Sequence, residues 1–295
     1  MRLANVEGRV KLLVDDRLVD IEQATNHRLP SNPMEAILRL DEIASLDLSG
    51  AEGVPAADAK LGPPVPRPSK ILAAGGNYND HLEEEGAEAP GEPNLFAKLP
   101  SALVGPRDEI EIPPGRTNID WEVELVVVIG KRARNVSVAD AWSYVAGVTC
   151  GQDVSDREEQ FRAFQQWTMA KSFDTYAPTG PYLVTLDEIE NRDDIPLQCY
   201  IDGEQMQGGS TAKLIFSVPT LISWASHVST LEPGDLLFTG TPGGVGAFRN
   251  PPRWLQHGET LRSVIHGVGE MENTIVSIAA AGGIAAGAEA AVPTT

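Results

Sequence analysis

The stretch D-W-E-V-E-L-V-V-V-I-G, residues 120–130, decides how the rest of the chain is arranged. After Glu124 it is apolar, rich in β-branched residues and ends at a glycine, which predicts a buried strand. Alternate side chains of a strand share one face, so Glu122 and Glu124 are expected to point the same way. Two carboxylates at the mouth of a buried strand repel each other, and they need either protonation or a cation.

A third carboxylate follows a second apolar stretch, V-A-G-V-T-C-G-Q-D, which ends at Asp153. Asp153 can join the two glutamates if the two strands are neighbours. Three carboxylates without a histidine or cysteine partner suit a hard cation, Mg²⁺, Mn²⁺ or Ca²⁺, rather than zinc. The alternative is that Glu122 and Glu124 form the solvated face of an edge strand, which is the commoner meaning of an isolated E-x-E.

Composition limits the classes of protein that fit. The chain has 295 residues, with 23 Lys and Arg against 42 Asp and Glu, a net charge of −19. This charge argues against nucleic acid or an anionic membrane as a partner, although a local Lys or Arg can still hold a small anion. No apolar run approaches the roughly 18 residues of a membrane span, and no signal-peptide core is visible. With only Cys150 and Cys199 present, we expect no disulfide framework and a cytoplasmic location.

The order of the segments predicts an α+β chain that is mostly β. Strand patterns dominate, a Pro-rich stretch interrupts them after about residue 60, and the last residues are rich in Ala and Gly. The predicted organisation is a small N-terminal β-rich subdomain (1–60), a Pro-rich linker (61–69), the main domain (70–278) and a flexible tail (279–295). A hairpin is expected to turn at Asp15 and Asp16.

Several polar residues are candidates for catalysis. If the start of N-Y-N-D-H-L-E-E-E-G, residues 77–86, is helical, His81 and Glu84 lie at i and i+3 on one face. A carboxylate beside an imidazole raises its basicity, as a general base requires; the alternative is a surface helix with an incidental histidine. Lys171 lies in an apolar segment, where a semi-buried lysine can polarise a carbonyl or hold a carboxylate, although a surface lysine is commoner.

Two further segments flank these candidates. After Asp153, Ser155 is expected to cap a helix that carries Arg157 and Gln160 near the carboxylates. The stretch G-D-L-L-F-T-G-T-P-G-G-V-G, residues 234–246, predicts a strand that runs into a glycine-rich loop able to present N–H groups to an anion. It lacks the G-K-[ST] of a Walker loop and no helical pattern follows it, so nucleotide binding is not expected.

The order of these motifs resembles the fumarylacetoacetate hydrolase family, in its bacterial catabolic branch. No single motif is decisive, but seven in the same order argue against chance. They are N-Y-x-D-H-x-E-E (77–84), L-F-x-K-x-P-S-A-L-V-G-P (95–106), W-E-V-E-L-x-V-V-I-G (121–130), G-x-D-V-S-x-R-x-x-Q (151–160), K-S-F-D-T (171–175), G-P-Y-L-V-T (180–185) and G-D-x-x-x-T-G-T-P-x-G-V-G (234–246).

The resemblance implies a mixed β-sandwich-like roll with peripheral helices, a homodimer, and one bound Mg²⁺ or Mn²⁺. It also implies that the acidic segment 84–93 is a lid that orders when ligand binds. The implied roles are metal ligands for Glu122, Glu124 and Asp153, catalytic residues for His81, Glu84 and Lys171, and substrate-binding residues for Arg157, Gln160 and Thr241.

The chain departs from the family pattern at two positions. Asn79 stands where many members have arginine, and Asp156 stands where alanine is usual. Both changes leave the implied chemistry intact and leave the identity of the substrate open. The segment A-F-R-N-P-P-R-W-L, residues 247–255, resembles members described as hydroxymuconate-type isomerases.

The implied function is hydrolysis of a carbon–carbon bond in a 2,4-diketo acid of the acylpyruvate type, a small anionic keto acid. His81, oriented by Glu84, would activate water, and a pyruvate enolate stabilised by the metal would leave while Lys171 holds the substrate oxygens. The same site could instead serve an isomerase, an oxaloacetate-type decarboxylase or a keto-deoxy sugar acid dehydratase. Hydrolysis is favoured because the His81–Glu84 pair is intact; a non-catalytic binding protein would be expected to lose one of these residues.

Overall fold

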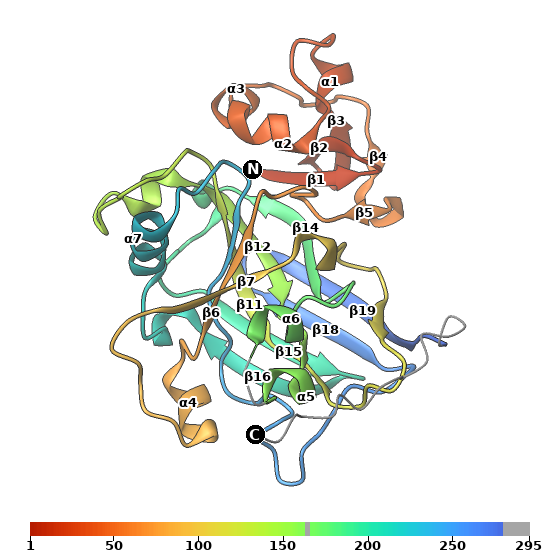
Figure 1. Cartoon of the computed structure of the whole chain (residues 1–295). Helices are drawn as coiled ribbons and strands as arrows, with labels where there is room; N and C mark the ends of the chain where they lie inside the picture. The colour runs from red at the N-terminus through yellow and green to blue at the C-terminus, as the bar shows by residue number, and fades with distance from the viewer. Residues whose placement is uncertain (163–165, 280–295) are drawn as a thin grey trace, which may run out of the picture.

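Most strands of the protein belong to two sheets. The computed structural model describes residues 1–162 and 166–279 (Figure 1). The large sheet has, in spatial order, β4 (Val54–Pro55), β3 (Arg17–Asp20), β2 (Arg9–Val14), β1 (Arg2–Val6), β14 (Ala177–Val184), β12 (Val145–Gln152), β11 (Val123–Ile129), β17 (Leu236–Phe238), β6 (Ile71–Gly75) and β7 (Asn94–Lys98). In addition, β5 (Leu61–Gly62) pairs with β1, and β8 (Leu103–Val104) pairs with β14.

The second sheet covers one face of the first. Its order is β16 (Glu204–Ser210), β15 (Pro196–Ile201), β18 (Thr260–Ile265), β19 (Gly269–Ser277) and β9 (Ile110–Ile112). β11 packs against β15 and β18, and β12 packs against β18 and β19. Every residue of β11 is therefore buried, as its continuous apolar run predicted. This packing confirms the predicted α+β fold with a β-sandwich core.

Short helices lie around the sheets, and in the ranges 1–162 and 166–279 only one of them exceeds two turns. They are α1 (Ile21–Ala24), α2 (Pro33–Ala36), α3 (Leu40–Ala44), α4 (Asn79–Glu85), α5 (Arg157–Gln160), α6 (Trp167–Ala170) and α7 (Val218–Val228). Figure 1 shows α5 and α6 close to the ends of the central strands, with α4 at the lower left, beyond the end of β6. None of the helices in the described part of the chain is long and apolar enough to cross a membrane.

The N-terminal unit is a β-rich unit that continues the large sheet. Asp15 and Asp16 form its hairpin turn with positive φ angles of 47° and 61°, as predicted. β1 pairs with β14, so hydrogen bonds of one sheet cross the predicted boundary between the N-terminal unit and the main domain. The domain limits at residues 60, 70 and 278 stay a prediction. The predicted tail lies, after residue 279, outside the described residues.

The helix after Asp153 begins later than expected. Ser155 and Asp156 form the short strand β13, which pairs with β10 (Ile119–Asp120). The pairing keeps Ser155 extended, so the prediction that Ser155 caps the helix was wrong. The carboxylate of Asp156 caps α5 instead and accepts the N–H of Glu159 at 3.0 Å. The aspartate that departs from the family pattern therefore has a local structural role.

Candidate active site

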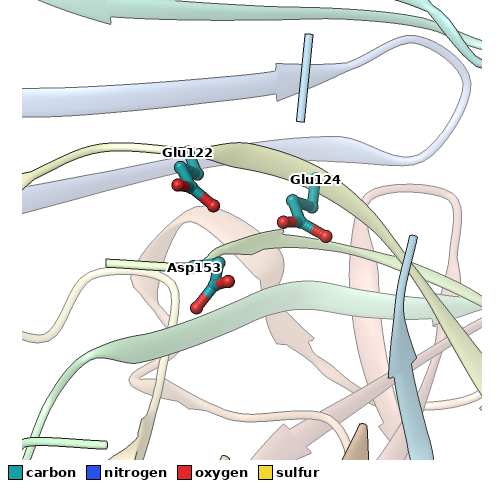
Figure 2. A group of neighbouring side chains, drawn as sticks. All are labelled: Glu122, Glu124 and Asp153. Atoms are coloured by element: carbon teal, nitrogen blue, oxygen red, sulfur yellow. The ribbon is translucent and has the colours of Figure 1, made fainter. Parts of the chain in front are cut away.

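Glu122, Glu124 and Asp153 meet where β11 begins and β12 ends. The two strands are antiparallel neighbours, with Val123 opposite Gln152, and the N–H of Asp153 donates to the carbonyl of Glu122 at 2.9 Å. Each of the three side chains offers a carboxylate oxygen, and these oxygens lie within 4.8 Å of one another (Figure 2). All three side chains are buried. The two strands are thus neighbours, which is the condition for Asp153 to join the two glutamates. Because the side chains are buried, the alternative that Glu122 and Glu124 form the solvated face of an edge strand is excluded.

Two cations contact Glu122 in this carboxylate group. Lys171 Nζ lies 2.8 Å from both Glu122 Oε2 and Asp153 Oδ2. Arg157 Nη2 lies 2.7 Å from Glu122 Oε1, while its Nε donates to Asp120 Oδ2 at 2.8 Å. Burial alone would raise the pKa of Glu122, but the positive charges of Lys171 and Arg157 outweigh it and lower that pKa well below its usual range.

Lys98 is a member of the cluster to which the sequence analysis assigned no role. Its Nζ donates to Asp153 Oδ1 at 2.6 Å and to the carbonyl oxygen of Lys171, and its side chain is inaccessible to solvent. Burial lowers the pKa of Lys98 against the attraction of Asp153. The motif at residues 95–106 contains Lys98, which is the last residue of the edge strand β7. The sequence alone does not show toward which residues its side chain points.

Glu124 is the carboxylate that these cations do not reach. Within the described residues it has no ion-pair partner, and its Oε2 accepts only the N–H of Gly240 at 2.6 Å. Burial, together with the charges of Asp153 and Glu122, raises the pKa of Glu124 well above its ordinary value. A divalent cation would supply the positive charge that Glu124 lacks, and it would face three hard oxygen donors. The residues therefore fit a Mg²⁺ or Mn²⁺ site.

His81 projects from α4 into the neighbouring pocket and is 6% exposed. Within the described part of the chain, its Nδ1 is buried without a hydrogen-bond partner. Burial lowers the pKa of His81, and the attraction of Glu122 does not offset it, so the imidazole is neutral at pH 7. The ring of Phe248 lies 5.9 Å from the imidazole. His81 thus meets the electrostatic requirement for a base.

The i, i+3 spacing predicted that Glu84 lies beside His81, and the positions of Glu84 and Glu85 differ from this prediction. Glu84 Oε2 accepts the N–H of Gly244 at 2.8 Å, and no hydrogen bond joins it to His81 among the described residues. Glu85, at i+4 from His81, lines the pocket instead. Partial burial raises the pKa of Glu85. The catalytic role of Glu84 stays a prediction, and Glu85 is a pocket residue that the i, i+4 spacing could have indicated.

One pocket brings together most of the residues that the sequence analysis named. Arg157 Nη1 donates to Gln160 Oε1 at 2.7 Å, and Thr241 Oγ1 donates to the carbonyl of Val123 at 2.9 Å. The free space inside is about 20 Å³, which is room for about one water molecule. The predicted residues that line it are His81, Glu122, Arg157, Gln160, Lys171 and Thr241.

The glycine-rich loop at residues 234–246 does present N–H groups to anions, and these anions are the protein's own carboxylates. Besides the bonds from Gly240 to Glu124 and from Gly244 to Glu84, the N–H of Gly246 donates to Asp120 Oδ1 at 2.7 Å. Asp120 in turn holds Arg157. The loop therefore positions site residues from three parts of the chain.

The sequence pattern described as fumarylacetoacetate (FAA) hydrolase C-terminal matches residues 70–276 of the chain. The chain belongs to the fumarylacetoacetate hydrolase family. The resemblance drawn from the seven motifs is confirmed, and membership makes the protein an enzyme of this superfamily.

Relatives within the family carry different reactions in their names. The mitochondrial oxaloacetate tautomerase Fahd2a of Rattus norvegicus is 42% identical over 76% of this chain and 71% of its own length. Maleylpyruvate hydrolase from Sphingobium sp. SYK-6, solved with manganese(II) and pyruvate, is 32% identical, covers 94% of this chain and 99% of its own, and has a TM-score of 0.79. The 2-hydroxyhepta-2,4-diene-1,7-dioate isomerase of Mycobacterium marinum is 30% identical, covers 94% and 98%, and has a TM-score of 0.74.

Proposed function

We propose that the protein is a divalent-metal-dependent enzyme that enolises small 2-oxo acids, with the keto–enol tautomerisation of oxaloacetate as its leading reaction. The observation that carries the proposal is the state of His81. Its imidazole is buried at the pocket and, among the described residues, has no hydrogen bond to a carboxylate, and burial lowers its pKa, which favours the neutral form. Tautomerisation moves a proton between carbon 3 and the enol oxygen, so it needs a neutral base beside the carbon and no activated water.

The roles of the other residues follow from their contacts. Glu122, Glu124 and Asp153 would hold Mg²⁺ or Mn²⁺. When bound, such an ion draws electron density from the keto oxygen and makes the neighbouring C–H bond more acidic. Arg157 and Lys171 supply positive charge for the carboxylates of the acid, while Gln160 and Thr241 offer polar contacts.

His81 would take the proton from carbon 3 and pass it to the enol oxygen, and the reverse reaction would return it by the same route. A neutral imidazole has one unprotonated ring nitrogen that can accept this proton, and burial beside Phe248 limits the access of water to the carbon that loses it. The name of the rat relative supports the reaction, and the pyruvate found with manganese(II) in the Sphingobium relative supports the class of substrate.

Hydrolysis of an acylpyruvate-type 2,4-diketo acid, which the sequence analysis favoured, is the second candidate. The maleylpyruvate hydrolase relative supports it. It requires Glu84 to orient His81 toward water, and here Glu84 accepts a hydrogen bond from Gly244 instead. We therefore rank it behind tautomerisation. Hydrolysis would need Glu84 to exchange the Gly244 N–H for the imidazole.

The test follows the ultraviolet band of the enol. Oxaloacetate and a series of acylpyruvates are offered with Mg²⁺, then with EDTA, and pyruvate is quantified in the same samples. Metal-dependent decay of enol-oxaloacetate without pyruvate, with enzyme-dependent deuterium exchange at carbon 3, supports tautomerisation. Decay of acylpyruvates with stoichiometric pyruvate supports hydrolysis, and pyruvate with CO₂ from oxaloacetate supports decarboxylation. No metal-dependent change with any of these acids would refute both candidates.

The resemblance also leads us to infer a homodimer. Light scattering coupled to size exclusion would then give twice the chain mass of 31.6 kDa, and a mass of one chain at micromolar concentration would contradict this.

A further inference from the structure

Trp167 forms one wall of the active-site pocket, and the sequence analysis gave it no role. It is the first residue of α6 and lines the pocket together with Gly75 and Gly76. Its ring lies directly on the end of β6: a Cβ built on Gly75 would come 2.2 Å from Cζ3 of the indole. The strand must therefore carry glycine there, because any side chain would displace the ring.

Packing on a second side holds the indole in place. The ring of Phe96, on the neighbouring strand β7, meets it edge to face, with centroids 5.4 Å apart and planes at 72°. Phe96 pairs with Ala73 of β6, so both surfaces that the indole touches belong to one hydrogen-bonded pair of strands. An aromatic ring fixed in this way cannot move aside at low cost.

The position of Trp167 relative to the carboxylates follows from α6. Lys171 lies at i+4 from Trp167, and its N–H donates to the carbonyl of Trp167 at 3.0 Å. Its Nζ contacts Glu122 and Asp153 and lies 5.2 Å from the Phe96 centroid. Residues four apart lie about one helical turn apart on the same face. The backbone of Trp167 is thus one turn from that of Lys171, and the indole and the Lys171 ammonium group both lie beside the ring of Phe96.

We propose that Trp167, seated on Gly75, sets the upper limit on substrate length. The pocket as described has room for about one water molecule, so a short 2-oxo acid enters only when other lining groups move, and the fixed indole rejects longer alkyl or acyl chains. The inference rests on the proposed function and deepens it. An acid whose keto oxygen lies at the cation that Glu122, Glu124 and Asp153 would hold, and whose chain points along α6, meets the indole. Since one methylene changes discrimination by about 10- to 200-fold in a fitted pocket, a rigid ring at this place is an effective length filter.

The test measures binding of 2-oxo acids of increasing length by calorimetry in the presence of Mg²⁺, which needs no turnover. The wild type is expected to bind 2-oxobutanoate and to bind 2-oxooctanoate at least about ten-fold more weakly. W167A should reverse that preference, with W167L between the two, while G75A should weaken even the short acid because the added methyl group pushes the indole into the pocket.

Met169 provides the matched control, because it lies on the same helix and is 54% exposed. M169A should keep the wild-type ratio of the two affinities, and thermal melts of all variants show whether each is folded. If the wild type binds both acids equally, or if folded W167A and W167L keep the wild-type ratio, the length filter is refuted while the proposed function stands. If the wild type binds no 2-oxo acid, the proposed function fails, and the filter with it.

Discussion

Replacing Glu124 by glutamine separates metal binding from folding. The amide has the same shape and keeps an oxygen that can accept the N–H of Gly240, so the local hydrogen bond survives. The substitution removes a buried carboxylate that has no ion-pair partner among the described residues, and such an uncompensated charge is unfavourable. We therefore expect metal-free E124Q to be at least as stable as the metal-free wild type at pH 7.

The wild type, by contrast, should gain stability from the ion. A ligand that binds only the folded state at 100 times its Kd stabilises that state by about 2.7 kcal/mol. For a chain of this size, 1 kcal/mol corresponds to roughly 2–4 °C. The expected rise in Tm on saturation with Mg²⁺ or Mn²⁺ is therefore about 5–10 °C, and E124Q should show little of it.

The pH dependence of stability provides a second way to compare E124Q with the wild type. The pKa of Glu124 is raised in the folded protein, so the folded state favours the protonated acid. The contribution of this group to stability is full below the unfolded pKa, near 4.3, and is lost as pH rises through the folded value. In EDTA, the advantage of E124Q over the wild type should thus be absent at pH 4 and grow toward neutral pH.

Thermal melts by scanning calorimetry, with EDTA, Mg²⁺ or Mn²⁺, measure all of these quantities. E83Q is the matched control, since Glu83 is an exposed glutamate of α4, and it should behave as the wild type does. An equal metal-induced rise in Tm for E124Q and the wild type would show that Glu124 is not a ligand. A metal-free E124Q that is several kcal/mol less stable than the wild type would refute the view of Glu124 as an uncompensated charge.

The remaining predictions concern the base and its surroundings. H81Q should lower kcat for tautomerisation by about 10²- to 10⁴-fold with an unchanged Tm. The wild-type activity should fall at acid pH with a pKa below the ordinary 6.5 of histidine, and an apparent pKa above 6.5 would contradict a buried His81 as the base. E84Q should leave tautomerisation within a few-fold of wild type and abolish any acylpyruvate hydrolysis, and an equal loss of both activities would show that Glu84 serves the shared proton transfer. K98M should cost roughly 3 kcal/mol of unfolding free energy in EDTA, because it leaves one oxygen of the buried Asp153 without its cation; chemical denaturation that finds less than about 0.5 kcal/mol would contradict this.

Local patterns predicted those features that depend on neighbours in the sequence. Alternation placed Glu122 and Glu124 on one face, and the apolar run after Glu124 predicted a fully buried strand, which β11 is. Two adjacent aspartates predicted the turn between β2 and β3, because Asp tolerates the left-handed conformation found there. The N-cap at Ser155 failed because pairing with the distant β10 overrode the local preference.

Patterns along the chain were therefore enough to predict the family, the buried strand and the residue types that make up a hard-cation site. The folded arrangement was needed to show that Asp153 lies against Glu122, that Lys98 contacts Asp153, and that Glu85 rather than Glu84 lines the pocket. It also placed Trp167 on Gly75. The physical reason is that these contacts join segments far apart in the chain. Strand register and packing set their side-chain directions, whereas periodicity reports only which face of its own element a residue occupies.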